Sequence, residues 1–119
     1  MGWNRLVSLC NHENLHERSF EIELSNMYAH YKAGNYIALF NLMEQYEQKL
    51  RLIHTYWYLR ALTAKKLEKF SLASSYFDVA ISIAPDNPNL LRDISIFYRE
   101  EGDYLLALEY ASRLVKLFP

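Results

Sequence analysis

Residues 67–85 read LEKFSLASSYFDVAISIAP, and residues 101–119 read EGDYLLALEYASRLVKLFP. The two stretches lie 34 residues apart, and the aromatic, small, aliphatic and proline positions of one coincide with those of the other. The paired positions are Phe70 with Tyr104, Ala73 with Ala107, Ile83 with Leu117, and Pro85 with Pro119. A fixed period of this length is typical of proteins in which one supersecondary unit recurs. We therefore expect a fold built from stacked copies of one unit.

The unit reads as two helices joined by a tight turn. Over residues 103–118 the apolar residues recur at steps of three and four, which places them on one face of a helix. They are Tyr104, Ala107, Leu108, Ala111, Leu114, Val115 and Phe118. Gly102 follows an earlier helical stretch, where a left-handed residue ends a helix at least cost, and Asp103 stands where a helix N-cap is favoured. Such a hairpin cannot bury its apolar face alone, so neighbouring hairpins must stack.

A weaker copy of the unit precedes these two. In AGNYIALFNL, residues 33–42, Gly34 and Asn35 repeat the turn, whereas Leu39 stands where the later copies have alanine. The expected helices are a short one at 3–9 and then hairpins at 20–33 with 36–50, 54–67 with 70–83, and 89–101 with 104–118. No Gly or Pro interrupts residues 49–53, so one long continuous helix is the alternative at that point.

The period and the residues that carry it resemble the tetratricopeptide repeat family. The matching residues are Trp57, Ala73, Phe77, Ala80 and Pro85 in one copy, and Tyr98, Gly102, Tyr104, Ala107 and Pro119 in the next. The resemblance covers residues 20–119 and implies an all-α fold, a right-handed superhelical stack of three antiparallel helix hairpins. Its repeats would be 20–53, 54–87 and 88–119, preceded by an N-terminal helix and turn at 1–19. Arg60 departs from the family's pattern, which has an apolar residue there, so the register of the 54–67 helix is open to a shift of one residue.

The composition narrows the class of protein. Thirteen basic and fourteen acidic side chains give a net charge of −1, so no overall field attracts nucleic acid or an anionic membrane. No apolar run approaches the roughly 20 residues that span a bilayer. The single cysteine, Cys10, excludes an internal disulfide framework and fits a reducing compartment. We expect a cytoplasmic protein without nucleic-acid or membrane partners.

One motif points to a different function. The segment HENLH, residues 12–16, spells the H-E-x-x-H pattern that binds zinc in metalloproteases when it lies on a helix. The longer form of the pattern is absent, since Ser19 stands where it has glycine. Asn14 followed by Glu17 resembles a capping box, which would take the two histidines off a common helical face. We therefore expect no catalytic residues, no metal and no cofactor, and keep a zinc metallohydrolase as the distant alternative.

The resemblance also implies where a partner binds. In the tetratricopeptide family the first helix of each hairpin lines a concave groove. The residues that this geometry places in the groove are Leu24, Tyr28, Tyr31, Tyr58, Leu59, Leu62, Lys65, Arg92, Ile96 and Arg99. Leu24 and Tyr28 occupy positions where the family's carboxylate clamp has Lys and Asn, so that clamp is absent.

Two kinds of function follow from such a groove. One is a scaffold or adaptor module that binds an apolar or amphipathic segment of a partner protein. The other is a small chaperone, similar to the short tetratricopeptide chaperones of bacterial secretion systems, that shields an apolar segment of a client. In addition, the apolar face of residues 104–118 has no covering helix after it in this sequence, so we expect it to meet another copy or a further part of a longer protein.

Overall fold

The computed structural model describes residues 20–119. The expected helix at 3–9 and the HENLH motif lie outside the described residues. The helices are α3 (Glu21–Lys32), α4 (Tyr36–Gln45), α5 (Glu47–Leu50), α6 (His54–Lys66), α7 (Phe70–Ile83), α8 (Pro88–Glu100) and α9 (Tyr104–Leu117). No strand occurs among residues 20–119, so the predicted all-α class is confirmed. None of these helices is long and apolar enough to cross a membrane.

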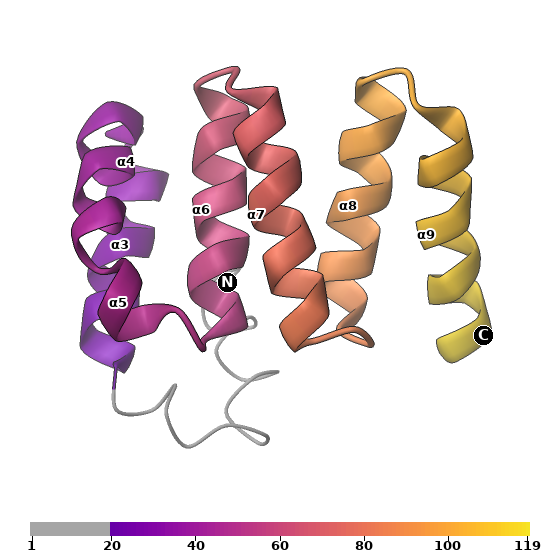
Figure 1. The fold of residues 1–119 in the computed structure, drawn as a ribbon, viewed down its shortest axis with the longest axis horizontal. Helices are drawn as coiled ribbons and strands as arrows, with labels where there is room; N and C mark the ends of the chain where they lie inside the picture. Colours follow the sequence, from indigo (N-terminus) through magenta and orange to yellow (C-terminus); the bar gives the residue numbers. More distant parts are fainter. Residues whose placement is uncertain (1–19) are drawn as a thin grey trace.

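The helices form three hairpins that stand side by side in chain order (Figure 1). The first is α3 with α4 and α5, the second is α6 with α7, and the third is α8 with α9. The predicted helix over 36–50 is interrupted at Tyr46, which separates α4 from α5. A turn at residues 51–53 then separates α5 from α6, so the alternative of one continuous helix is wrong.

The three hairpin turns share one backbone geometry. Gly34 and Gly102 have φ values of 83° and 84°, and Glu68, midway between them in the 34-residue period, has a φ of 59°. This left-handed conformation closes the first helix of each hairpin, and glycine adopts it without the steric cost of a Cβ atom. Sequence reasoning found the two glycines and missed Glu68, because its residue type gives no sign of a positive φ.

Capping residues start some of these helices as expected. The Asp103 carboxylate accepts a hydrogen bond from the backbone N–H of Leu106, and Asn87 accepts one from that of Leu90. Each bond satisfies an N–H that has no partner within its helix. Asn35 occupies the N-cap position of α4 without forming such a bond, because its amide lies 3.4 Å from the Nδ1 atom of His30 instead.

Small residues set how closely the paired helices approach. Ala73 in α7 and Ala107 in α9 are buried against the first helix of their own hairpin, while the equivalent position in α4 is Leu39. The larger side chain holds α3 and α4 further apart, and these two helices touch at fewer places than α6 with α7 or α8 with α9. The degeneracy seen in the first unit's sequence therefore has a structural counterpart.

The second and third hairpins join through aromatic packing. The rings of Phe77 in α7 and Phe97 in α8 have centroids 5.3 Å apart, and the hydroxyls of Ser74 and Tyr98 lie within 2.8 Å of each other. Aromatic pairs at such distances stabilise a core beyond their buried area. Neighbouring hairpins thus share one core, as stacked repeats require.

Helix α6 lies at the centre of the stack and is buried on nearly all sides. The expected shift of its register does not occur, because Arg60 is buried at the position that Ile94 occupies in α8. The charge is tolerated there because the Nη1 atom of Arg60 donates a hydrogen bond to Glu47 at 2.6 Å. The guanidinium also lies over the ring of Tyr76, 4.4 Å from its centroid, in a cation–π contact.

Candidate functional site

The first helices of the three hairpins, α3, α6 and α8, share one face of the molecule. The hydroxyl of Tyr58 in α6 donates a hydrogen bond to the carboxylate of Asp93 in α8. Tyr31 in α3 is close enough to Asp93 for that carboxylate to raise the pKa of the Tyr31 hydroxyl. We call the surface formed by α3, α6 and α8 the first-helix face.

Residues spaced by 34 form rows across the first-helix face, one residue from each helix. The first row is Leu24, Tyr58 and Arg92; the second is Tyr28, Leu62 and Ile96; the third is Tyr31, Lys65 and Arg99. The second row is apolar in all three helices, and each of its members is half-buried. A stacked repeat brings equivalent positions next to one another, so this row forms an apolar strip that is partly open to solvent.

Tyrosines gather at the α3 end of this face. The rings of Tyr28 and Tyr31 are stacked with centroids 6.3 Å apart, and Tyr36 meets Tyr31 edge to face at 5.5 Å. Burial raises the pKa of the Tyr31 hydroxyl to about 12, and Tyr36 and Asp93 contribute in the same direction. Tyr31 is therefore neutral at physiological pH and serves as a hydrogen-bonding group with a large apolar ring.

Charged residues flank the strip at the other end. The Nζ atom of Lys65 lies 2.6 Å from the Glu100 carboxylate. The hydrogen bond from Lys65 lowers the pKa of Glu100, and Arg99 and Lys66 lower it further. Arg92 lies 3.6 Å from Asp93. The region around Glu100 thus holds three cations and one carboxylate, and keeps a positive balance.

Two of the residues expected to line a groove belong to the core instead. Leu24 is fully buried, and Tyr58 is buried with its hydroxyl bonded to Asp93. Leu59 is buried as well. The physical reason is that α6 is enclosed by α3, α4, α7 and α8, so residues on several of its faces pack against neighbouring helices. The other expected residues are half-buried or exposed on the first-helix face.

Comparison with known families now bears on this arrangement. The profile of a family described as YpiA-like, C-terminal tetratricopeptide repeats matches residues 54–119, more than half of the chain. The chain belongs to this tetratricopeptide repeat family. No curated protein matches the chain. The matched residues comprise α6 to α9, the two hairpins in which alanine allows close helix packing, and the resemblance inferred from the sequence is confirmed for them.

Sequence reasoning missed three polar residues of this tetratricopeptide face. Asn89, Asp93 and Glu100 lie on α8, and the first two are one helical turn apart. Asp93 binds Tyr58, and the backbone carbonyl of Asn89 accepts a second, longer hydrogen bond from the same hydroxyl at 3.3 Å. Their spacing from Ile96, at three and seven residues, was the available signal. They give the first-helix face acceptors as well as cations.

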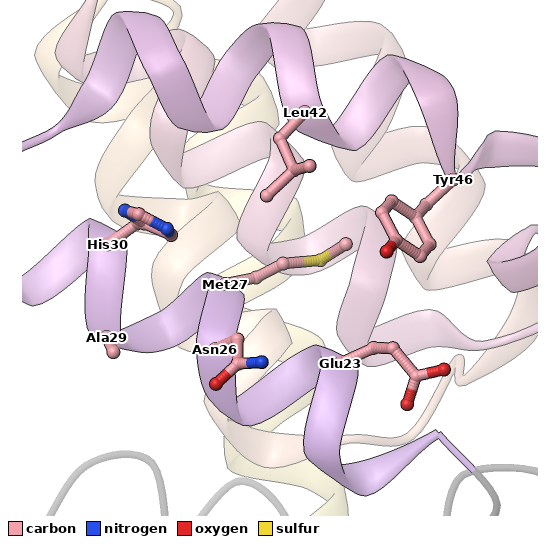
Figure 2. A pocket seen from close by; sticks show the side chains of 7 residues that line it. All are labelled: Glu23, Asn26, Met27, Ala29, His30, Leu42 and Tyr46. Carbon is pink, nitrogen blue, oxygen red and sulfur yellow. The ribbon is translucent and has the colours of Figure 1, made fainter.

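A separate pocket of about 350 Å³ lies in the first hairpin (Figure 2). Side chains of α3 and α4 point toward one another across it. They are Glu23, Asn26, Met27, Ala29, His30, Leu42 and Tyr46. The pocket occupies the space that the wider separation of α3 and α4 leaves, and it includes none of the expected groove residues. In residues 20–119, no three His, Cys, Asp or Glu side chains form a group that could hold a metal ion.

Proposed function

We propose that this protein is a non-catalytic interaction module that binds an apolar or amphipathic segment of a partner protein along the first-helix face, in the cytoplasm. Tetratricopeptide repeats present extended surfaces of this kind. The observation that carries the proposal is the half-buried apolar row of Tyr28, Leu62 and Ile96, which runs across all three hairpins. A contiguous apolar strip that stays partly exposed typically marks an interaction site.

The neighbouring rows indicate the chemistry of the bound segment. Tyr31 offers an apolar ring and a hydroxyl at the α3 end, and Arg99 is exposed at the α8 end. Tyrosine and arginine are the side chains most enriched in binding surfaces. The positive balance around Glu100 favours a segment that carries acidic residues near its α8 end, and this attraction acts on the association rate more than on the final affinity.

The chaperone role expected as an alternative uses the same face. A client would lay an apolar segment along the Tyr28–Leu62–Ile96 row in place of an adaptor's permanent partner. The same variants therefore test both roles, and the identity of the captured protein separates them.

The test begins with affinity purification and mass spectrometry of three forms of the full chain. They are the unchanged protein, Leu62→Glu on the first-helix face, and Ile37→Glu as a control at an exposed apolar residue of α4. We expect a partner that the unchanged protein and the control retain and that Leu62→Glu loses, with all three forms equally helical by circular dichroism. Retention of that partner by Leu62→Glu would place its site elsewhere.

A quantitative test follows once a partner segment is known. Tyr31→Ala should weaken its binding by about 1–3 kcal/mol if Tyr31 is a hot spot. Arg99→Ala should reduce the association rate at low salt and have little effect at high salt, because exposed charges are screened there. Equal affinities for Tyr31→Ala and the unchanged protein would contradict the assignment of this face.

A further inference from the structure

A second apolar surface lies on α9, at the end of the stack opposite α3 (Figure 1). Tyr104, Leu108 and Val115 are 69%, 64% and 66% exposed, and Ala111 lies between them on the same helical face. We call these four residues the α9 stripe. It is separate from the first-helix face, and the proposed function does not use it.

The stripe has the same place in its hairpin as the surface of α7 that receives α8. Subtracting 34 from Leu108, Ala111 and Val115 gives Ser74, Phe77 and Ile81. In α7, Ser74 bonds to Tyr98 of α8 and Phe77 packs on Phe97, while Ile81 packs against the core. The positions that bind a helix in the second hairpin are therefore exposed in the third, and α9 is shaped to receive a helix.

The residues of α9 fit a second copy of α9 in antiparallel orientation. We propose that two copies of this chain pair through the α9 stripe with their helices antiparallel and crossing at Ala111. Ala111 is the smallest member of the stripe and lets the two backbones approach most closely there. Leu108 of one copy then lies against Val115 of the other, and the contact is the same from both sides, as a two-fold interface requires.

Charge favours the antiparallel orientation as well. Glu109 and Lys116 lie beside the stripe on one flank of α9, seven residues apart, and both are exposed. Antiparallel pairing brings Glu109 of one copy toward Lys116 of the other twice, and it also sets the opposed helix dipoles side by side. Parallel pairing would place Glu109 against Glu109, which is unfavourable. The arrangement therefore selects one orientation.

The size of the contact sets the expected strength. A helix of 14 residues is about 21 Å long, and one pair of such helices buries less than the roughly 1,600 Å² of a standard interface. We expect a dimer that forms at high protein concentration and dissociates on dilution. Sedimentation velocity of the full chain over a wide concentration range should show monomer and dimer without larger species.

Variants test the surface and the orientation. Leu108→Glu should lower the association constant by about tenfold or more, whereas Ile37→Glu on α4 should leave it unchanged. Glu109→Lys and Lys116→Glu should each weaken the dimer, and the double exchange should restore it. Circular dichroism should show the same helicity for all variants, since these side chains are exposed in the single chain.

A cross-link tests the crossing point. In a chain with Cys10→Ser, Ala111→Cys should form a disulfide between copies on mild oxidation, because the two Cα atoms must lie within about 7 Å. Ile37→Cys in the same background should not. A chain that stays monomeric at millimolar concentration would overturn the proposal and leave a further polypeptide segment as the occupant of the stripe. Open chains of more than two copies, or a dimer unaffected by Leu108→Glu, would overturn it too.

Discussion

His54, the first residue of α6, is 6% exposed, and its burial lowers the pKa of the imidazole to about 4. The unfolded chain then binds a proton at higher pH than the folded chain does, so stability is complete above about pH 6.5 and falls as the pH decreases toward 4. We expect the free energy of unfolding to decrease by about 2 kcal/mol between pH 7 and pH 5 on account of this residue. Urea denaturation at the two pH values measures it.

The control is the same measurement on His54→Asn, which removes the titrating group. Its stability should be lower at pH 7, since a buried side chain has been altered, but should change much less between pH 7 and pH 5. His30→Asn, on α3, should retain the pH dependence of the unchanged protein. If His54→Asn and the unchanged protein lose equal stability on acidification, burial of His54 is not the cause.

At the scale of elements, α5 holds the charge of α6 in place. The Glu47 carboxylate accepts a hydrogen bond from Arg60, which is 3% exposed, and this bond raises the pKa of the guanidinium against the opposing effect of burial. Glu47→Ala should reduce the free energy of unfolding by about 2 kcal/mol, below the 3–5 kcal/mol of a fully buried pair because Glu47 is partly exposed. Thermal or urea denaturation measures the loss.

A double variant distinguishes charge from packing at this junction. Glu47→Gln with Arg60→Met removes both charges and keeps an apolar side chain of similar length between the rings of Trp57 and Tyr76. Its stability should return to within about 1 kcal/mol of the unchanged protein, because buried ion pairs often add little over an apolar pair. A double variant less stable than Glu47→Ala would show that the guanidinium contributes mainly through its ring contacts.

Element boundaries show what the sequence could predict and where it failed. The helices of the second and third hairpins follow from the 34-residue period and from local signals such as Asp103, which depend on neighbouring residues only. Burial of Leu24 and Tyr58 depends on which helices enclose α6, and a repeat pattern does not contain that information. The break at Tyr46 carries no Gly or Pro, so no local signal could predict it.

For the whole molecule, the unequal packing of the hairpins predicts unequal local stability. The first hairpin has Leu39 where the others have alanine, and its two helices make fewer mutual contacts. In stacked repeats each unit contributes its own stability and that of its interfaces, so weakly packed units open first. Amide hydrogen exchange should be faster in α3 and α4 than in α6 and α7, read by mass spectrometry of peptides. Uniform exchange over residues 20–119 would contradict this.

The turn at Glu68 makes the molecule a candidate for stabilisation by design. Gly34 and Gly102 adopt a left-handed backbone freely, whereas Glu68 does so at a φ of 59° with a full side chain. Glu68→Gly should remove that steric cost of about 1–2 kcal/mol, less part of it for the greater freedom of glycine in the unfolded chain. We expect a net gain of about 0.5–1 kcal/mol in urea denaturation, and Gly102→Ala should cause a loss of similar size. Restoring the family's own glycine would thus give a hardier scaffold for engineering without touching either proposed binding surface.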